Sequence, residues 1–350
     1  MLSLLSVGLA LASALGIVAG TCIPCKGDTW RELAPIPIAP RQEHTTVALS
    51  SSTIAILGGI VPEGEFGATT TDIMQLYDIP TDTWTSAASM PLPMNHANAA
   101  VVGGKLYLLG GLAVDTDEAW RAVPDSWVYD PDEDQWAPIT PMPNGAERGS
   151  AAMGVYDSKI YLAGGMTTLD IPGGGYQDSV ATVSAYDTIR GTWTTFSERL
   201  PEGRDHAGGA VVGSKLYVLG GRYFGQHGIR DTVFSLDLTV TNATWQTSLA
   251  RMPTARGGVS AGTIGTRIYI FGGEGNEAEG SNGVFNQTEV FDTVTETWER
   301  LPPMKLPRHG TSAVAVNGRV YIPGGGIYQS AGPVNTTDVF CPIEAMAVST

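Results

Sequence analysis

The sequence predicts an all-β protein in which six similar sheets follow one another along the chain. A Gly-Gly doublet recurs six times in the 350 residues, at intervals of 52, 54, 56, 52 and 52 residues. The doublets are Gly58-Gly59, Gly110-Gly111, Gly164-Gly165, Gly220-Gly221, Gly272-Gly273 and Gly324-Gly325. A short apolar segment typical of a β-strand precedes each doublet, for example KLYLL before Gly110. Repetition with a period near 50 residues predicts stacked units of one kind.

Aromatic residues follow each doublet at a regular distance. After a loop comes an aromatic-Asp pair such as Tyr77-Asp78, and a Trp stands six residues past the Asp in four repeats. These tryptophans are Trp84, Trp136, Trp193 and Trp298. The fourth repeat is looser, with Leu236-Asp237 and then Trp245. Because Tyr and Trp offer a large flat area with one polar handle, we expect them to fill the wedge between neighbouring sheets.

The two ends of the repeat region complement each other. Trp30 precedes the first doublet in a context that matches the last strand of a repeat, whereas the sixth repeat reaches Val339-Phe340-Cys341 and then lacks its Trp. We therefore expect the strand around Trp30 to complete the sixth sheet and close a ring over residues 30–341. A short segment (21–29) precedes the ring and a tail (342–350) follows it.

The double Gly followed by separated Tyr and Trp resembles the kelch repeat, over nearly the whole of residues 30–341. This resemblance implies a six-bladed kelch β-propeller with four antiparallel strands per blade. Kelch propellers also form the catalytic domain of copper-radical oxidases that resemble galactose oxidase, which need a Cys crosslinked to Tyr. The chain has no Cys between positions 26 and 340, and this excludes that activity.

The first twenty residues contain no charged side chain and predict a secretory signal peptide over residues 1–20, with an uncleaved membrane anchor as the alternative. No later segment is long and apolar enough to span a membrane. The net charge of −15 argues against a nucleic-acid partner, because phosphate binding needs a basic face. Three sequons predict glycosylation of a secreted, extracellular protein, at Asn242, Asn286 and Asn335.

Basic residues recur at fixed positions before the doublets. Arginine stands sixteen residues before four of them, at Arg148, Arg204, Arg256 and Arg308, and Arg41 lies beside the corresponding Gln42. The position fourteen residues before a doublet is His44, His96 or His206 in three of the repeats. Since residues two apart on a strand share a face, we expect these side chains to surround one mouth of the central channel. The alternative is that the arginines are structural and bond to carbonyl groups or to neighbouring carboxylates.

The cluster of Arg and His predicts a binding protein that recognises an anionic ligand, either an acidic glycan or a loop of an extracellular protein. Arginine suits that role because its planar fork grips a carboxylate through two hydrogen bonds. A second hypothesis is a sugar-modifying enzyme, since exported single-domain kelch proteins resemble sialic-acid mutarotases. The sequence assigns no catalytic residue, metal ligand or cofactor, and we expect a monomer.

The three cysteines lie at the chain ends, at Cys22, Cys25 and Cys341. A zinc or redox role for Cys22 and Cys25 would need a second ligand pair or a βαβ context, and the sequence has neither. We predict a disulfide between Cys341 and either Cys22 or Cys25, which contributes about 4–5 kcal/mol if chain entropy dominates. Peptide mapping without reduction tests this pairing, and alkylation of Cys341 in the native protein would contradict it.

Overall fold

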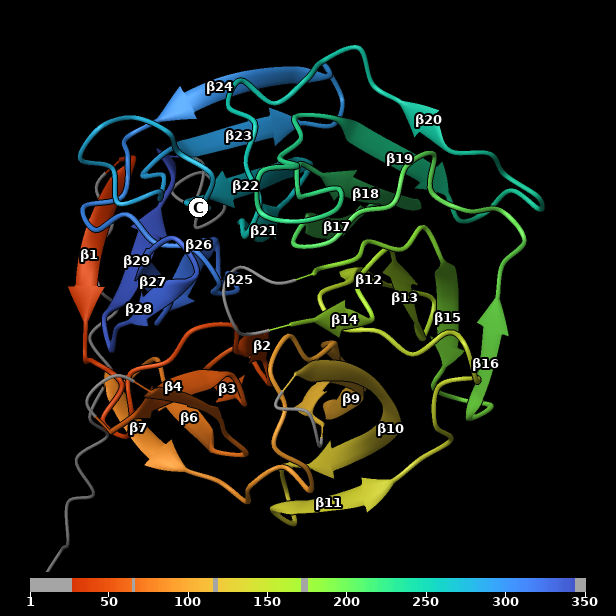
Figure 1. The fold of residues 1–350 in the computed structure, drawn as a ribbon, viewed down its shortest axis with the longest axis horizontal. Helices are drawn as coiled ribbons and strands as arrows, with labels where there is room; N and C mark the ends of the chain where they lie inside the picture. Colours follow the sequence, from red (N-terminus) through yellow and green to blue (C-terminus); the bar gives the residue numbers. More distant parts are fainter. Residues whose placement is uncertain (1–26, 65–66, 116–118, 171–175, 344–350) are drawn as a thin grey trace, which may run out of the picture.

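The computed structural model describes residues 27–64, 67–115, 119–170 and 176–343. Six antiparallel sheets form a ring around a central channel, as Figure 1 shows. The first strands of neighbouring blades contact one another around the axis. The predicted six-bladed, all-β propeller is confirmed. No helix within the described ranges is long and apolar enough to cross a membrane.

Each blade contains four main strands, which follow one another from the axis outward. Blade 1 consists of β2 (Thr45–Ala48), β3 (Thr53–Leu57), β6 (Met74–Asp78) and β7 (Thr83–Ser86). Blade 2 consists of β8 (Ala99–Val102), β9 (Lys105–Val114), β10 (Trp120–Asp130) and β11 (Gln135–Pro138). Blade 3 consists of β12 (Ala152–Tyr156), β13 (Lys159–Ala163), β15 (Val183–Asp187) and β16 (Thr192–Thr195).

The remaining three blades follow the same order. Blade 4 consists of β17 (Gly208–Val212), β18 (Lys215–Leu219), β19 (Val233–Asp237) and β20 (Gln246–Thr247). Blade 5 consists of β21 (Ser260–Ile264), β22 (Arg267–Phe271), β23 (Thr288–Asp292) and β24 (Thr297–Leu301). Blade 6 consists of β25 (Val314–Val316), β26 (Arg319–Pro323), β29 (Thr337–Cys341) and β1 (Thr29–Leu33).

Short strands extend the loops that follow the Gly-Gly doublets. Two of these loops form hairpins, β4 (Ile60–Glu63) with β5 (Gly67–Thr70), and β27 (Gly326–Tyr328) with β28 (Ala331–Pro333). A third short strand, β14 (Thr168–Leu169), pairs with β10 of the neighbouring blade. These elements raise walls around one mouth of the channel.

The ring closes between the first and last strands of the chain. Strand β1 pairs antiparallel with β29, so that Trp30 lies opposite Phe340. In Figure 1 the red β1 lies beside the blue strands of blade 6. This seam confirms the expected closure, and it joins the two ends of the ring through backbone hydrogen bonds.

The repeat tryptophans link each blade to the preceding one. The indole Nε1 of Trp84 donates to Ala34 O at 2.9 Å, and that of Trp136 donates to Ala88 O at 3.0 Å. Trp193, Trp298 and Trp30 make the corresponding bonds to Thr140, Ala250 and Pro302. Trp245 of the looser fourth repeat has no such partner among the described residues. The aromatic residues therefore fill the blade interfaces and link neighbouring blades by hydrogen bonds; the sequence predicted that they fill these interfaces.

The Gly-Gly doublets occupy a turn in which a side chain does not fit. Gly272 has φ +58, and a Cβ added there would lie 2.1 Å from Arg308 O. Gly273 has φ +111 and donates its N–H to the same carbonyl at 2.8 Å, from one blade to the next. Equivalent bonds join Gly59 to Met94, Gly165 to Arg204, Gly221 to Arg256 and Gly325 to Arg41. The doublet thus ends a strand and couples two blades.

We predict that Gly272→Ala destabilises the fold much more than Gly280→Ala. Both positions have positive φ, but a Cβ at Gly280 meets nothing within 4 Å. The left-handed backbone should cost each variant about 1–2 kcal/mol, and only Gly272→Ala adds a collision with backbone. Urea unfolding of the two variants measures the difference, and equal losses of unfolding free energy would contradict this account of the doublet.

Candidate functional site

The five predicted site arginines lie inside the blades. Their side chains are at most 1 % exposed in each case, at Arg41, Arg148, Arg204, Arg256 and Arg308. Four of them donate to the carbonyl of the first glycine of their own doublet: Arg148 to Gly164 at 2.7 Å, Arg204 to Gly220 at 2.8 Å, Arg256 to Gly272 at 2.7 Å and Arg41 to Gly58 at 3.5 Å. This contact explains why arginine and doublet keep a constant separation.

Some of these guanidinium groups also pair with buried carboxylates. Arg256 pairs with Glu289 at 2.6 Å, and Arg308 pairs with Asp338 at 2.9 Å. Burial lowers the pKa of Arg148 to about 10, so that the group is still charged at neutral pH. The predicted placement of the arginines at the channel mouth is therefore wrong, because the turn directs their side chains into the blade toward unpaired carbonyl groups.

The residue two positions after each arginine, and after Met94 in the second repeat, reaches the channel axis in an unusual backbone conformation. Four of these six residues are not glycine and still have φ between 51° and 54°, namely Glu43, His96, Ser150 and His206. Gly258 and Gly310 hold the other two positions. Non-glycine residues at positive φ are uncommon, and their cost is often accepted at functional sites.

These six residues form a ring of hydrogen bonds around the axis. Glu43 N donates to Gly310 O at 2.5 Å, and His96 N donates to Glu43 O at 2.9 Å. The ring continues from Ser150 N to His96 O, from His206 N to Ser150 Oγ, from Gly258 N to His206 O and from Gly310 N to Gly258 O. The side chains of the ring are thereby held at one level of the channel.

His44 lies outside this ring, contrary to the sequence prediction. Arg41 stands seventeen residues before its doublet, whereas the other arginines stand sixteen before theirs, so Glu43 takes the position equivalent to His96. His44 is 3 % exposed, and burial first, together with the charge of Arg41, lowers its pKa to about 3. It therefore lines the channel as a neutral imidazole.

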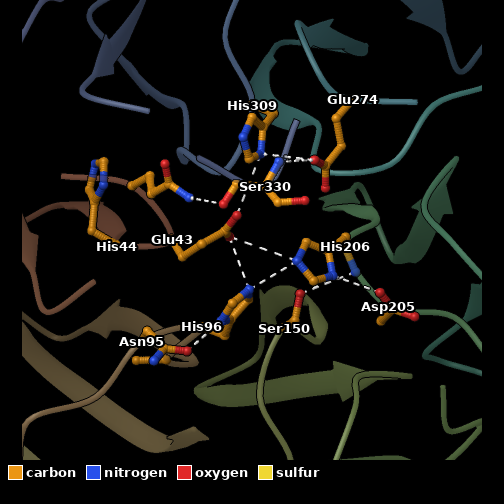
Figure 2. A network of polar contacts seen from close by, with 12 residues as sticks. Glu43, His44, Asn95, His96, Ser150, Asp205, His206, Glu274, His309 and Ser330 are labelled. Atoms are coloured by element: carbon orange, nitrogen blue, oxygen red, sulfur yellow. Dashed lines mark hydrogen bonds and ion pairs between the residues drawn. The ribbon is translucent and has the colours of Figure 1, made fainter. Parts of the chain in front are cut away.

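Glu43, His96 and His206 converge on one point at the channel mouth. Figure 2 shows Glu43 between His309 on one side and the pair of His96 and His206 on the other, with His44 apart from them. Glu43 Oε2 lies 3.1 Å from His96 Nε2 and 3.8 Å from His206 Nε2, and the two Nε2 atoms are 2.9 Å apart. The structure thus brings together His96 and His206 as predicted, and adds Glu43.

A second set of charged groups surrounds this cluster, and the sequence analysis missed it. Arg222 donates to Glu274 Oε1 at 2.5 Å and lies 3.3 Å from Asp205 Oδ1. Asp205 also holds His206 Nδ1 at 2.6 Å, while His309 Nδ1 lies 3.5 Å from both Glu43 and Glu274. Arg222 and Glu274 directly follow their doublets, at a position that is apolar in three other repeats (Ile60, Leu112 and Met166). A charged residue at that position was the signal in the sequence that could have identified them.

The ionisable groups of the site shift one another's pKa values. Burial alone raises the pKa of Glu43, but His96, His309 and His206 lower it more, to well below its usual value. Burial lowers the pKa of His309, yet Glu274 and Glu43 together raise it to about 9. Burial and the charge of Arg222 lower the pKa of His206 despite its bond to Asp205. At neutral pH the site therefore combines ionised carboxylates, a cationic His309 and a neutral His206.

A cavity of about 790 Å³ opens above this polar floor. Glu43, His96, His206, Arg222 and Glu274 line its base. Its walls come from the loops after the doublets and are largely apolar, with Ile60, Pro62, Trp120, Leu169 and Pro333. A smaller cavity of about 220 Å³ continues into the channel on the other side of Glu43, His96 and His206. The cluster thus separates a deep mouth from the channel.

The remaining predicted positions lie away from the cavity floor. The sequon residues are all in loops, with Asn242 and Asn335 exposed and Asn286 half-buried. Cys341 is buried at the end of β29 beside the ring seam. Cys22 and Cys25 lie outside the described residues. Glycosylation and the disulfide stay predictions.

A family model described as the KLHDC2/KLHL20/DRC7 Kelch-repeats domain matches residues 21–221 and 205–345. The chain belongs to the kelch-repeat β-propeller family. It is 43% identical over 303 residues to Kelch-like protein terF of Aspergillus terreus, covering 87% of this chain and 65% of that protein. It is 28% identical over 255 residues to Kelch domain-containing protein 3 of Bos taurus, covering 67% of this chain and 64% of that protein. The kelch chain thus spans somewhat less than two thirds of these curated relatives.

A solved structure shows the same fold. The structure titled "Structure of YjhT" aligns with a TM-score of 0.73 and 18% sequence identity, over 89% of this chain and 97% of that chain. At this identity the likeness concerns the propeller architecture alone.

We predict that Arg256→Ala lowers the free energy of unfolding of this kelch propeller by about 3–5 kcal/mol, because it takes the buried guanidinium partner away from the buried Glu289 carboxyl group. Arg300→Ala is the matched control, since Arg300 lies 3.6 Å from the same carboxylate but its side chain is 69% exposed. The control should change stability by about 1 kcal/mol or less. Chemical denaturation measures both, and similar losses would contradict a structural role for the buried arginine.

Proposed function

We propose that this kelch protein binds a small, hydroxyl-bearing organic molecule in the cavity above the channel mouth. The depth of the cavity carries this proposal: small-molecule sites are concave, largely apolar and equipped with a few convergent polar groups. In this protein an apolar wall that includes Trp120 surrounds a floor of Glu43, His96 and His206. A shallow face for a protein loop would not need such a volume.

Two buried polar atoms of the cavity lining support a ligand with both donor and acceptor groups. Trp120 Nε1 and Gln42 Oε1 are buried and have no hydrogen-bond partner in the described part of the chain. A buried polar atom without a partner costs free energy, so such atoms call for an explanation. Both atoms are closed to solvent, so a small movement of each side chain would first have to expose them. A hydroxyl group could then accept from the indole N–H and donate to the amide oxygen, and a sugar or another polyol offers several such groups.

The charge of the floor favours a ligand without net negative charge. The expectation of an anionic ligand rested on a cluster of arginine and histidine whose five arginines prove to be buried in the blades. The described cavity lining includes one arginine, Arg222. Its guanidinium group is already bonded to Glu274 and Asp205. Because Glu43 and Glu274 hold lowered pKa values and are ionised at neutral pH, we propose a neutral carbohydrate-like molecule in place of an acidic glycan.

Catalysis on such a sugar is the second candidate, and the ionisable groups of the floor favour it. A neutral imidazole oriented by a carboxylate, as His206 is by Asp205, has the form of a general base. Perturbed pKa values in a deep cavity are also typical of active sites. A sugar-modifying enzyme, the alternative suggested by the resemblance to mutarotases, would therefore use the same cavity.

We further propose that the protein is secreted and acts outside the cell as a monomer. The uncharged apolar segment at residues 1–20 and the three sequons support this address. Detection of the protein in culture medium with its mature N-terminus near residue 21 would agree with it, whereas retention of residues 1–20 would contradict it.

Thermal-shift screening of neutral sugars, acidic sugars and polyols tests the cavity. We expect a neutral hydroxylated compound to raise the melting temperature, and Trp120→Ala to weaken its binding at least tenfold. Trp120→Phe, which removes the N–H together with part of the ring but keeps an aromatic wall, should cost at least about 0.5–1.5 kcal/mol. Trp298→Phe is the control, because its N–H bonds to Ala250 away from the cavity. Binding that Trp120→Ala leaves intact would contradict the proposed site.

A further inference from the structure

We propose that Glu43, His96 and His206 bind one divalent transition-metal ion at the channel mouth. One ligand atom from each of these residues lies within 4.8 Å of the other two, and the described residues contain no other such group of three. The three atoms are Glu43 Oε2, His96 Nε2 and His206 Nε2, separated by 2.9, 3.1 and 3.8 Å. The proposal goes beyond the binding function above and does not depend on it.

The outer hydrogen bonds of the two imidazoles prepare them as metal ligands. His206 Nδ1 lies 2.6 Å from Asp205 Oδ1, and His96 Nδ1 lies 2.5 Å from Asn95 Oδ1. In the tautomer in which each Nδ1 donates to its oxygen, both rings present a lone pair at Nε2. A ring nitrogen bonded in this way to a carboxylate or carbonyl oxygen is the usual second shell of a metal-binding histidine.

In that tautomer the two rings need either a proton or a metal ion between them. Two Nε2 lone pairs at 2.9 Å repel each other, and the adjacent carboxylate oxygen adds a third electron-rich atom. Either a shared proton or a metal ion relieves the repulsion. Three convergent donors are more than one proton needs, and they match the two-histidine, one-carboxylate sets that bind zinc or iron.

The separations fit the dimensions of such a site. Ligand atoms at about 2.0–2.2 Å from a metal, at angles between octahedral and tetrahedral values, lie about 2.8–3.6 Å apart. The observed 2.9 and 3.1 Å fall inside this range, and 3.8 Å lies slightly above it. The 3.8 Å separation is the one that metal binding would have to shorten.

The surroundings hold these ligands and leave one side of the site open. The side chains of His96, His206 and Glu43 are 3%, 4% and 10% exposed, and their backbones belong to the hydrogen-bonded ring at positive φ. All three residues line both the large cavity and the channel cavity. A metal with three protein ligands would therefore have positions open toward a molecule in the large cavity, where it would polarise a hydroxyl or carbonyl oxygen as a Lewis acid.

Zinc binding by the untagged, full-length protein tests the proposal without any organic ligand. Protein treated with a chelator and reloaded with Zn²⁺ should retain about one zinc per chain after gel filtration, as measured by mass spectrometry of the metal, and zinc should raise its melting temperature. X-ray absorption of the zinc-loaded protein should show two imidazole nitrogens and one oxygen at about 2.0–2.2 Å. A zinc environment containing sulfur or lacking imidazole would overturn the proposal.

Single substitutions separate this cluster from other histidines. His96→Gln and His206→Gln should each weaken zinc binding at least about 100-fold, because losing a second-shell partner alone costs about 10–100-fold. Asn95→Leu should fall in that second-shell range. His44→Gln is the matched control, since His44 is a buried imidazole that lines the channel cavity outside the cluster. Zinc affinity equal in wild type and His206→Gln, or lost equally in His44→Gln, would overturn the assignment.

The metal test and the ligand test fail independently. If the protein binds no zinc but still binds a ligand in a Trp120-dependent way, the metal site is contradicted and the proposed cavity function is not. If zinc binds through the two histidines but no compound of the panel binds, the proposed cavity function is contradicted and the metal site is not.

Discussion

The propeller depends on contacts made by the segments that carry the buried arginines, and at Arg204 and Arg256 the contact is double. The guanidinium group donates to the first glycine carbonyl of its own doublet, as Arg256 does to Gly272. The backbone carbonyl of the same arginine accepts from the second glycine of the preceding blade, as Arg256 O does from Gly221 N at 3.0 Å. One residue thus joins two blades where both backbones turn and lack strand partners.

Arginine suits this position because several carbonyl groups must be satisfied at once in a dry interior. A planar guanidinium offers five donors and keeps its charge when buried, whereas a lysine offers one point charge that is readily neutralised. The charge is balanced by Glu289 and Asp338 in blades 5 and 6. Removing the arginine would leave orphaned carbonyls and unpaired carboxylates together, which is why we expect loss of stability and not loss of binding.

The same segment also builds the candidate site, two residues further along the chain. There the backbone turns left-handed and reaches the axis, and six equivalent residues bond to one another in a ring. Three of the six are Glu43, His96 and His206, and two are glycines. The candidate ligand-binding side chains therefore lie on one side of the mouth. The loops that follow the doublets then wall the cavity. Scaffold and site are therefore consecutive parts of one motif.

The sequence alone determined the blade number, the strand order and the closure by β1, because each depends on periodic glycines and aromatic residues that only one register satisfies. It also singled out His96 and His206. Only the tertiary structure decided where the arginines point, because alternation of side chains holds along a strand and fails at a turn with positive φ. The extra residue after Arg41 exchanged His44 for Glu43 in the ring. Arg222 and Glu274 left a signal in the sequence as polar residues directly after their doublets, but only the tertiary structure showed that they meet Asp205 and His309 around the cluster.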